Sequence, residues 1–155
     1  MTPAPEQPDG PAAVSGPVRQ ATYVVATAFL VIGVLGFVPG VTAEYDEMRF
    51  AGPDSNAQLF ELFTVSILHN VVHLVFGVVG IVMARGARPA RIYLIVGGLI
   101  YLLLFIYGML VERGSDADIV PLDEASNWLH LGLAIAMVLL GLLPSTRRGG
   151  HRAAG

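Results

Sequence analysis

Residues 92–111 read IYLIVGGLIYLLLFIYGMLV, a continuous stretch without a charged side chain. A helix rises about 1.5 Å per residue, so a stretch of this length spans the roughly 30 Å hydrocarbon core of a bilayer. We therefore predict a transmembrane helix here. Three further apolar stretches lie at about residues 21–38, 59–84 and 125–143. Together they predict an all-α fold, a four-helix transmembrane bundle.

The composition of the 155-residue chain agrees with this prediction. Hydrophobic residues make up 54% of the chain and charged residues 14%, which is too much apolar surface for one soluble core. Four spans leave only short loops and tails, so we expect one membrane domain over residues 19–144. Residues 1–18, rich in Pro, Ala and Gly, predict a disordered tail, and residues 145–155 a basic cytoplasmic tail.

A short basic segment joins the second predicted span to the third. It runs from Arg85 to Arg91 and contains Gly86, which suits a helix end, and Pro89, which suits a helix start. These residues predict a tight helical hairpin. For the first span, a cleaved signal peptide ending at Ala43 is the alternative, although the preceding apolar stretch is longer than a typical signal core.

Charged residues sort to the two ends of the predicted bundle. With four spans, most arginines share one end: Arg19, Arg85, Arg88, Arg91, Arg147, Arg148 and Arg152. Most acidic residues share the other: Glu44, Asp46, Glu47, Asp54, Glu61, Glu112, Asp116, Asp118, Asp123 and Glu124. Because arginines accumulate on the cytoplasmic side, we expect both termini in the cytoplasm and the protein in the plasma membrane.

Several function classes find no support in the sequence. The chain has no cysteine, which excludes disulfides, thiolate metal sites and thiol nucleophiles. A nucleophile elbow, a P-loop, a dinucleotide-binding fingerprint and a zinc-protease motif are all missing, so the sequence favours a protein without catalytic activity. No basic patch is interleaved with aromatic residues, so nucleic acid is not an expected partner. We detect no internal repeat.

Polar and small residues of two spans fall on one narrow stripe each, at about 100° per residue. The second span places on its stripe Ser66, His69, His73, Gly77, Gly80 and Ala84. The fourth places Asp123, Asn127, His130, Ala134, Met137 and Gly141. Polar groups avoid lipid and small residues allow close helix approach, so both stripes are predicted to face the bundle interior. We expect Gly77, Gly80 and Gly132 to serve helix packing.

The histidines of these stripes are the candidate functional residues. His69 and His73 lie one turn apart on one helix face, with His130 at a similar depth on the other helix. We interpret them as interhelical hydrogen-bonding groups and predict no cofactor. One alternative is a metal or haem site formed by the three histidines. The other is a proton or ion path.

Three polar neighbours extend this candidate cluster. Asn70 lies beside the stripe of the second span, where it is expected to hydrogen-bond across to another helix. Asp123, Asn127 and His130 are spaced so that the carboxylate would orient the imidazole through the amide. The simpler interpretation is that Asp123 stabilises a helix N-terminus.

The motifs His69-Asn-Val-Val-His73-Leu-Val-Phe-Gly77-Val-Val-Gly80 and Ser126-Asn127-Trp128-Leu129-His130-Leu-Gly132 resemble a family of small bacterial membrane proteins known as domain of unknown function 4383. The resemblance covers about residues 20–144. The family's second-helix pattern corresponds here to Asn70, His73, Gly77 and Gly80. Its fourth-helix pattern, Asn-x-x-Asp-Asn-x-x-His, corresponds to Asp123, Ser126, Asn127 and His130, and this chain departs from it at the first two positions. The resemblance implies a four-helix integral membrane protein and no particular activity.

The sequence thus predicts a membrane protein that is structural or interacts with other membrane components. Its expected partners are the lipid bilayer and other membrane proteins, or further copies of itself. A histidine-based redox protein and a small channel or transporter are the alternatives.

Overall fold

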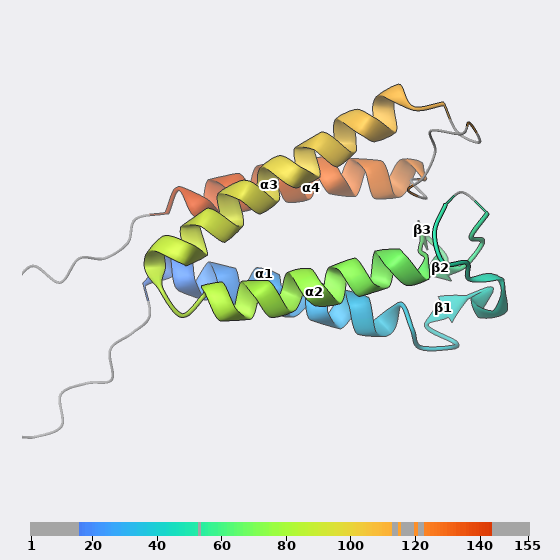
Figure 1. Cartoon of the computed structure of the whole chain (residues 1–155), viewed down its shortest axis with the longest axis horizontal. Coiled ribbons are helices and arrows are strands. Elements are labelled where there is room, and N and C mark those ends of the chain that lie inside the picture. Colours follow the sequence, from blue (N-terminus) through green and yellow to red (C-terminus); the bar gives the residue numbers. More distant parts are fainter. Residues whose placement is uncertain (1–15, 53, 113–114, 116–119, 121–122, 144–155) are drawn as a thin grey trace, which may run out of the picture.

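The fold is taken from a computed structural model of the chain (Figure 1). It describes residues 16–52, 54–112, 115, 120 and 123–143. The predicted basic tail and residues 1–15 of the predicted N-terminal tail lie outside the described residues. Several of the charged residues that predict the orientation also lie outside the described residues, namely Asp116, Asp118, Arg147, Arg148 and Arg152.

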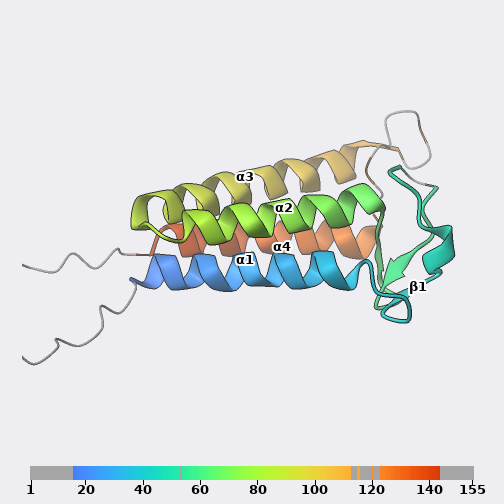
Figure 2. The same cartoon turned by 60° about the horizontal axis from the view of Figure 1, so that its bottom comes forward.

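Four α-helices form in the described part of the chain. They are α1 (Pro17–Leu35), α2 (Ile67–Met83), α3 (Ala87–Leu110) and α4 (Glu124–Gly141). The helices lie along one long axis, with the α2–α3 turn at one end and a small sheet at the other (Figure 2). Helices α1, α3 and α4 are long and apolar enough to cross a membrane, and α2 is a shorter apolar helix. The predicted all-α, four-helix fold class is confirmed.

The second predicted span begins later than expected. Residues 59–66, predicted to be helical, instead belong largely to a three-stranded antiparallel sheet that forms between α1 and α2. Its strands are β1 (Thr42–Ala43), β2 (Gln58–Leu59) and β3 (Phe63–Thr64), and a 3₁₀ turn, η1 (Tyr45–Glu47), follows β1. Phe60 and Glu61 adopt positive φ values of 56° and 58°. A helix cannot continue through this left-handed conformation, so α2 begins only after it.

The helices pack as two pairs, α1 with α2 and α3 with α4, and the contacts between the pairs are fewer. In each pair, an arginine near the start of the first helix binds the end of the second. Nε of Arg19 donates to the carbonyl of Ala84 (2.9 Å), and Nε of Arg91 donates to the carbonyl of Gly141 (3.0 Å). These bonds satisfy carbonyl groups that have no partner within their own helix.

Helices α2 and α4 repeat the same residue types at the same distances from their N-caps. Ser66 caps α2 and Asp123 caps α4. Each cap is followed by asparagine four residues later, by histidine seven residues later and by a small residue after eleven and eighteen: Asn70, His73, Gly77 and Ala84 in α2, and Asn127, His130, Ala134 and Gly141 in α4. This correspondence at four positions, called the repeat below, becomes visible only when residues are counted from the two caps.

Helices α1 and α3 correspond in the spacing of their buried residues. The buried residues Val18, Thr22, Ala26 and Phe29 of α1 correspond, 72 positions later, to the buried residues Ala90, Leu94, Gly98 and Tyr101 of α3. The close contacts inside each pair also correspond. A Cβ on Gly77 would lie 2.9 Å from the Ala26 carbonyl oxygen, and one on Gly98 would lie 2.9 Å from that of Ala134. The two helix pairs therefore use buried residues and close contacts at corresponding positions.

Candidate functional site

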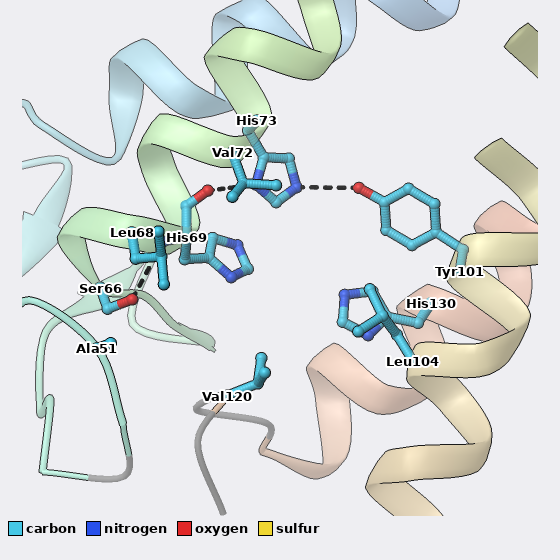
Figure 3. Close-up of a pocket in the computed structure, with 10 residues that line it drawn as sticks. All are labelled: Ala51, Ser66, Leu68, His69, Val72, His73, Tyr101, Leu104, Val120 and His130. Atoms are coloured by element: carbon cyan, nitrogen blue, oxygen red, sulfur yellow. Dashed lines mark hydrogen bonds between the residues drawn. The ribbon is translucent and has the colours of Figure 1, made fainter.

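A cavity of about 180 Å³ lies between the two helix pairs near the sheet end. Its walls include three histidines, a tyrosine and two aliphatic residues: His69, His73, His130, Tyr101, Val72 and Leu104. Figure 3 shows the three imidazole rings and the Tyr101 hydroxyl turned toward the same space. The histidines of the α2 and α4 stripes thus face the space between the helix pairs and surround this cavity.

The start of α2 fixes two of the histidines. The hydroxyl of Ser66 accepts a hydrogen bond from the backbone N–H of His69 (3.1 Å), which caps the helix. One turn later, Nδ1 of His73 lies 2.9 Å from the carbonyl oxygen of His69. A carbonyl only accepts, so Nδ1 carries the proton and Nε2 of the neutral ring is an acceptor. The Tyr101 hydroxyl lies 3.4 Å from that Nε2 and donates to it.

Corresponding aromatic pairs hold the two inner histidines. Phe29 packs on His73 with ring centroids 5.5 Å apart, and Tyr101 packs on His130 at 5.2 Å. The interplanar angles, 49° and 51°, are nearly equal. Phe29 and Tyr101 stack on each other between the helix pairs, 5.5 Å apart and 7° from parallel. The histidines therefore sit in equivalent positions on either side of one aromatic stack.

Three buried polar atoms have no hydrogen-bond partner within the described residues. They are Oδ1 of Asn70, Oδ1 of Asn127 and Nδ1 of His130. Asn70 does not bond across to another helix as predicted, since its Nδ2 instead lies 3.8 Å from the sulfur of Met48, beyond η1. The backbone N–H of Asn127 donates to the Asp123 carbonyl (3.0 Å), but Oδ1 of Asn127 and Nδ1 of His130 have no partner among the described residues, so the predicted carboxylate–amide–imidazole relay is not formed.

Asp123 instead connects α4 to the sheet. Its carboxylate accepts from the backbone N–H of Ser126 (2.6 Å) and from that of Thr64 in β3 (2.5 Å). Burial alone would raise the pKa of Asp123, but the hydrogen bonds from Thr64 and Ser126 outweigh it and hold the pKa below its usual value. The simpler of the two interpretations, a helix N-cap, describes this residue.

The three histidines do not form a metal cluster in this geometry. The rings of His69 and His73 lie 4.3 Å apart. Among the described residues, no group of three or more histidine, aspartate or glutamate side chains is placed to hold a metal ion. The cavity is also smaller than the roughly 300 Å³ at which drug-sized ligand sites begin, and it is accordingly small for a haem.

The predicted packing glycines divide into two kinds. Gly77 and Gly80 are buried, and a Cβ on Gly80 would lie 2.6 Å from that of Ala26. Gly132 is exposed, and a Cβ there would meet nothing within 4 Å in the described structure. Gly132 therefore makes no helix contact inside the chain, because its position on α4 faces away from the other helices.

Sequence reasoning missed Tyr101, whose hydroxyl completes the polar wall of the cavity. The third span contains several aromatic residues, and its periodicity does not distinguish them. The signal that identifies Tyr101 is its position 72 residues after Phe29, in the repeat described above.

A comparison with known protein families finds the family that the motifs of α2 and α4 resemble. A family model for a domain of unknown function, DUF4383, matches residues 19–143. No curated protein and no solved structure matches the chain. The family resemblance predicted from those motifs is confirmed, and the chain belongs to the DUF4383 family.

Proposed function

We propose that this chain is an integral protein of the plasma membrane, that it crosses the bilayer four times, and that it acts by contacting other membrane components. The observation that carries the proposal is the exposure of large apolar side chains on every helix. Examples are Val24 and Val31 on α1, Val75 and Val78 on α2, Leu103 and Leu110 on α3, and Ile135 and Leu139 on α4. Soluble monomers rarely expose apolar patches beyond a few hundred Å², whereas a bilayer requires such a surface.

The short helix α2 is compatible with a fourth crossing. Its 17 residues give a length of about 25 Å, a few Å less than the hydrocarbon core. At the sheet end, Phe50, Phe60 and Leu62 are more than half exposed and extend the apolar surface beyond the helix. A small mismatch of this kind costs a bilayer little.

The charges support an orientation with both termini in the cytoplasm. Arg85 and Arg88 lie at the α2–α3 turn, at the end of the bundle where α1 begins and α4 ends (Figure 1). Glu44, Asp46 and Glu47 lie at the opposite end, around β1 and η1. Arginine-rich ends stay on the cytoplasmic side, so the sheet end is expected to face outward.

Cysteine labelling tests the orientation cleanly because the chain has no cysteine of its own. Two exposed positions at opposite ends are suitable, Arg88→Cys and Asp46→Cys. In intact cells, a membrane-impermeant maleimide should label the Asp46→Cys variant, and it should label Arg88→Cys only after the membrane is permeabilised. Labelling of both variants from the same side would refute the proposed topology.

The proposed role is tested by photo-crosslinking in the membrane. A photoreactive residue replacing Leu103, which is 64% exposed, should give discrete protein adducts. The same residue at Leu94, which is fully buried on the same helix, is the matched control and should give none. If Leu103 gives lipid adducts only, the proposed role is wrong.

We propose no resident cofactor, because no group of three or more histidine, aspartate or glutamate side chains in the described structure is placed to hold a metal ion. An absorbance spectrum and metal analysis of the purified protein test this point. A Soret band or a stoichiometric metal ion would contradict it.

A further inference from the structure

We propose that the cavity between the two helix pairs is a binding site for a small, mostly apolar molecule that carries a hydroxyl group and is about the size of a phenol. This inference goes beyond the membrane role proposed above. It rests on the volume of the cavity, on the polar groups in its wall, and on a comparison with the corresponding region on the other side of the Phe29–Tyr101 stack.

The volume and the walls define the apolar part of the ligand. An apolar cavity of about 150 Å³ accommodates a benzene molecule, and this cavity measures about 180 Å³. Leu68, Val72 and Leu104 supply aliphatic wall. A single ring with one substituent therefore matches the space.

The polar wall defines the functional group. His130 is only 4% exposed, it lines the cavity, and its Nδ1 has no partner within the described structure. Among the described residues, Nε2 of His73 is an acceptor that receives only a long hydrogen bond, 3.4 Å, from the Tyr101 hydroxyl. A hydroxyl both donates and accepts, so it can pair with a neutral imidazole in either tautomer and with a tyrosine. A carbonyl or an ether would lack the donor that His73 requires.

The region related by the repeat shows what a closed version of the same site looks like. A second cavity, about 70 Å³, is lined by Phe29, Ile32, Ser126 and Leu129, together with the three histidines His69, His73 and His130 that also line the larger cavity. These four residues correspond in the repeat to Tyr101, Leu104, His69 and Val72 of the larger cavity. The β2–β3 turn and β3 add Phe60 and Phe63 to the wall of the smaller cavity.

The two sides therefore differ in chemistry as well as in volume. The larger cavity has the hydroxyl of Tyr101 in its wall, where the smaller cavity has the ring of Phe29, and His69 lines both cavities. The Tyr101 hydroxyl adds hydrogen-bonding capacity on the larger side. Helix packing alone does not require this hydroxyl, since Phe29 packs at the corresponding position without one.

Fluorine NMR with 4-fluorophenol tests the proposal on the full chain in lipid nanodiscs. We expect a bound signal that is distinct from the signal of fluorophenol dissolved in protein-free nanodiscs. Val72→Phe should fill the cavity and weaken binding at least tenfold. Val78→Phe is the matched control, because Val78 is exposed on the same helix and does not line the cavity; it should bind as the wild type does.

A second variant removes only the polar recognition. Tyr101→Phe introduces the residue that the other helix pair has at this place, so the fold should accept it. It should weaken fluorophenol binding about three- to tenfold, and fluorobenzene, which lacks the hydroxyl, should bind the wild type weaker by a similar factor. The imidazole ¹⁵N resonances of His73 and His130 should shift with fluorophenol in the wild type.

Two results would overturn the proposal. One is the absence of any signal beyond that of protein-free nanodiscs at saturating fluorophenol. The other is binding that Val72→Phe leaves unchanged. Nanodiscs expose both faces of the protein, so neither result depends on the topology proposed above.

Discussion

The α1–α2 pair and the α3–α4 pair use the same helix contacts and differ where they meet the sheet. Both have an arginine that binds the end of the second helix, a Gly–Ala crossing, and a histidine packed on an aromatic ring. Toward the sheet end, the pairs differ at Phe29 and Tyr101 and at Ser126 and His69. The shared positions maintain packing, whereas the differences lie around a cavity.

This contrast separates two roles that residues of one type play in the same bundle. Each pair has a histidine at the equivalent position, His73 in one and His130 in the other, and these positions belong to the packing frame, the set of positions that both pairs share. His69 and the Tyr101 hydroxyl have no counterpart of the same type in the other pair, so the shared packing does not require them. If this is correct, changes at shared positions should alter stability, and changes at the positions that differ should act mainly at the cavity.

The largest effect is expected from a change that breaks the frame inside one pair. A Cβ on Gly36, at the end of α1, would lie 2.1 Å from Oδ1 and 2.4 Å from Cγ of the buried Asn70. Gly36→Ala should therefore lower the unfolding free energy by about 3 kcal/mol or abolish folding. Gly132→Ala is the control and should change stability by less than about 1 kcal/mol, because its Cβ meets nothing. Unfolding in mixed micelles measures both, and equal effects would contradict the packing described for Gly36.

The arginine caps should differ in strength between the pairs. Within the described part of the chain, Arg91 makes two side-chain hydrogen bonds, from Nε to the Gly141 carbonyl and from Nη2 to the Leu143 carbonyl (2.7 Å), whereas Arg19 makes one to the Ala84 carbonyl. Arg91→Ala should cost about 2 kcal/mol, and Arg19→Ala about half as much. Thermal unfolding of the two variants measures the difference. A larger loss of stability for Arg19→Ala than for Arg91→Ala would contradict this prediction.

The two N-caps should differ in their response to pH. The pKa of Asp123 is lowered in the folded state, so its contribution to stability is present above the unfolded pKa of about 3.9 and is lost as the pH falls through the lower folded pKa. Asp123→Ser, which copies the cap of α2, should cost about 1 kcal/mol at neutral pH and remove this acid-dependent loss. Unfolding measured from pH 6 to pH 2 tests the prediction. Ser66→Ala, which removes the uncharged cap of α2, is the comparison variant. An unchanged pH profile in Asp123→Ser would contradict it.

The smallest effect on stability is expected at the aromatic stack. Tyr101→Phe removes one long hydrogen bond and leaves a ring that the other pair already uses at this position. The unfolding free energy should change by less than about 1 kcal/mol. A loss of several kcal/mol would mean that the hydroxyl belongs to the packing frame and not to the cavity.

The apolar stretches predict most of the fold, because length and hydropathy alone place α1, α3 and α4 within a few residues of the predicted spans. The start of α2 was not predictable in this manner. Residues 59–65 are nearly as apolar as the helix that follows, and nothing in the composition shows that Phe60 and Glu61 take the left-handed conformation, which usually requires glycine or asparagine.

The candidate site was likewise predictable only in part. The stripes of α2 and α4 indicate that His73 and His130 face inward, since polar groups avoid lipid wherever a bundle interior exists. Helices α2 and α3 diverge from their turn, as Figure 1 shows. The extent of this divergence decides whether the histidines meet a metal, each other or an open space. That divergence follows from packing between pairs, which helical periodicity does not encode. Tyr101 was missed for the same reason.

The packing of the two helix pairs against each other is the central claim, and the stack of Phe29 on Tyr101 tests it most directly. Solid-state NMR of the chain in bilayers, with ¹³C in the tyrosine Cζ and in the phenylalanine rings, measures the contact. We expect a cross-peak from Tyr101 to Phe29, whose ring centroids lie 5.5 Å apart, and its loss in Phe29→Leu while the contact of Tyr101 with Phe76, at 6.0 Å, persists. A Tyr101 resonance that contacts Phe76 and never Phe29 would show that the pairs meet differently.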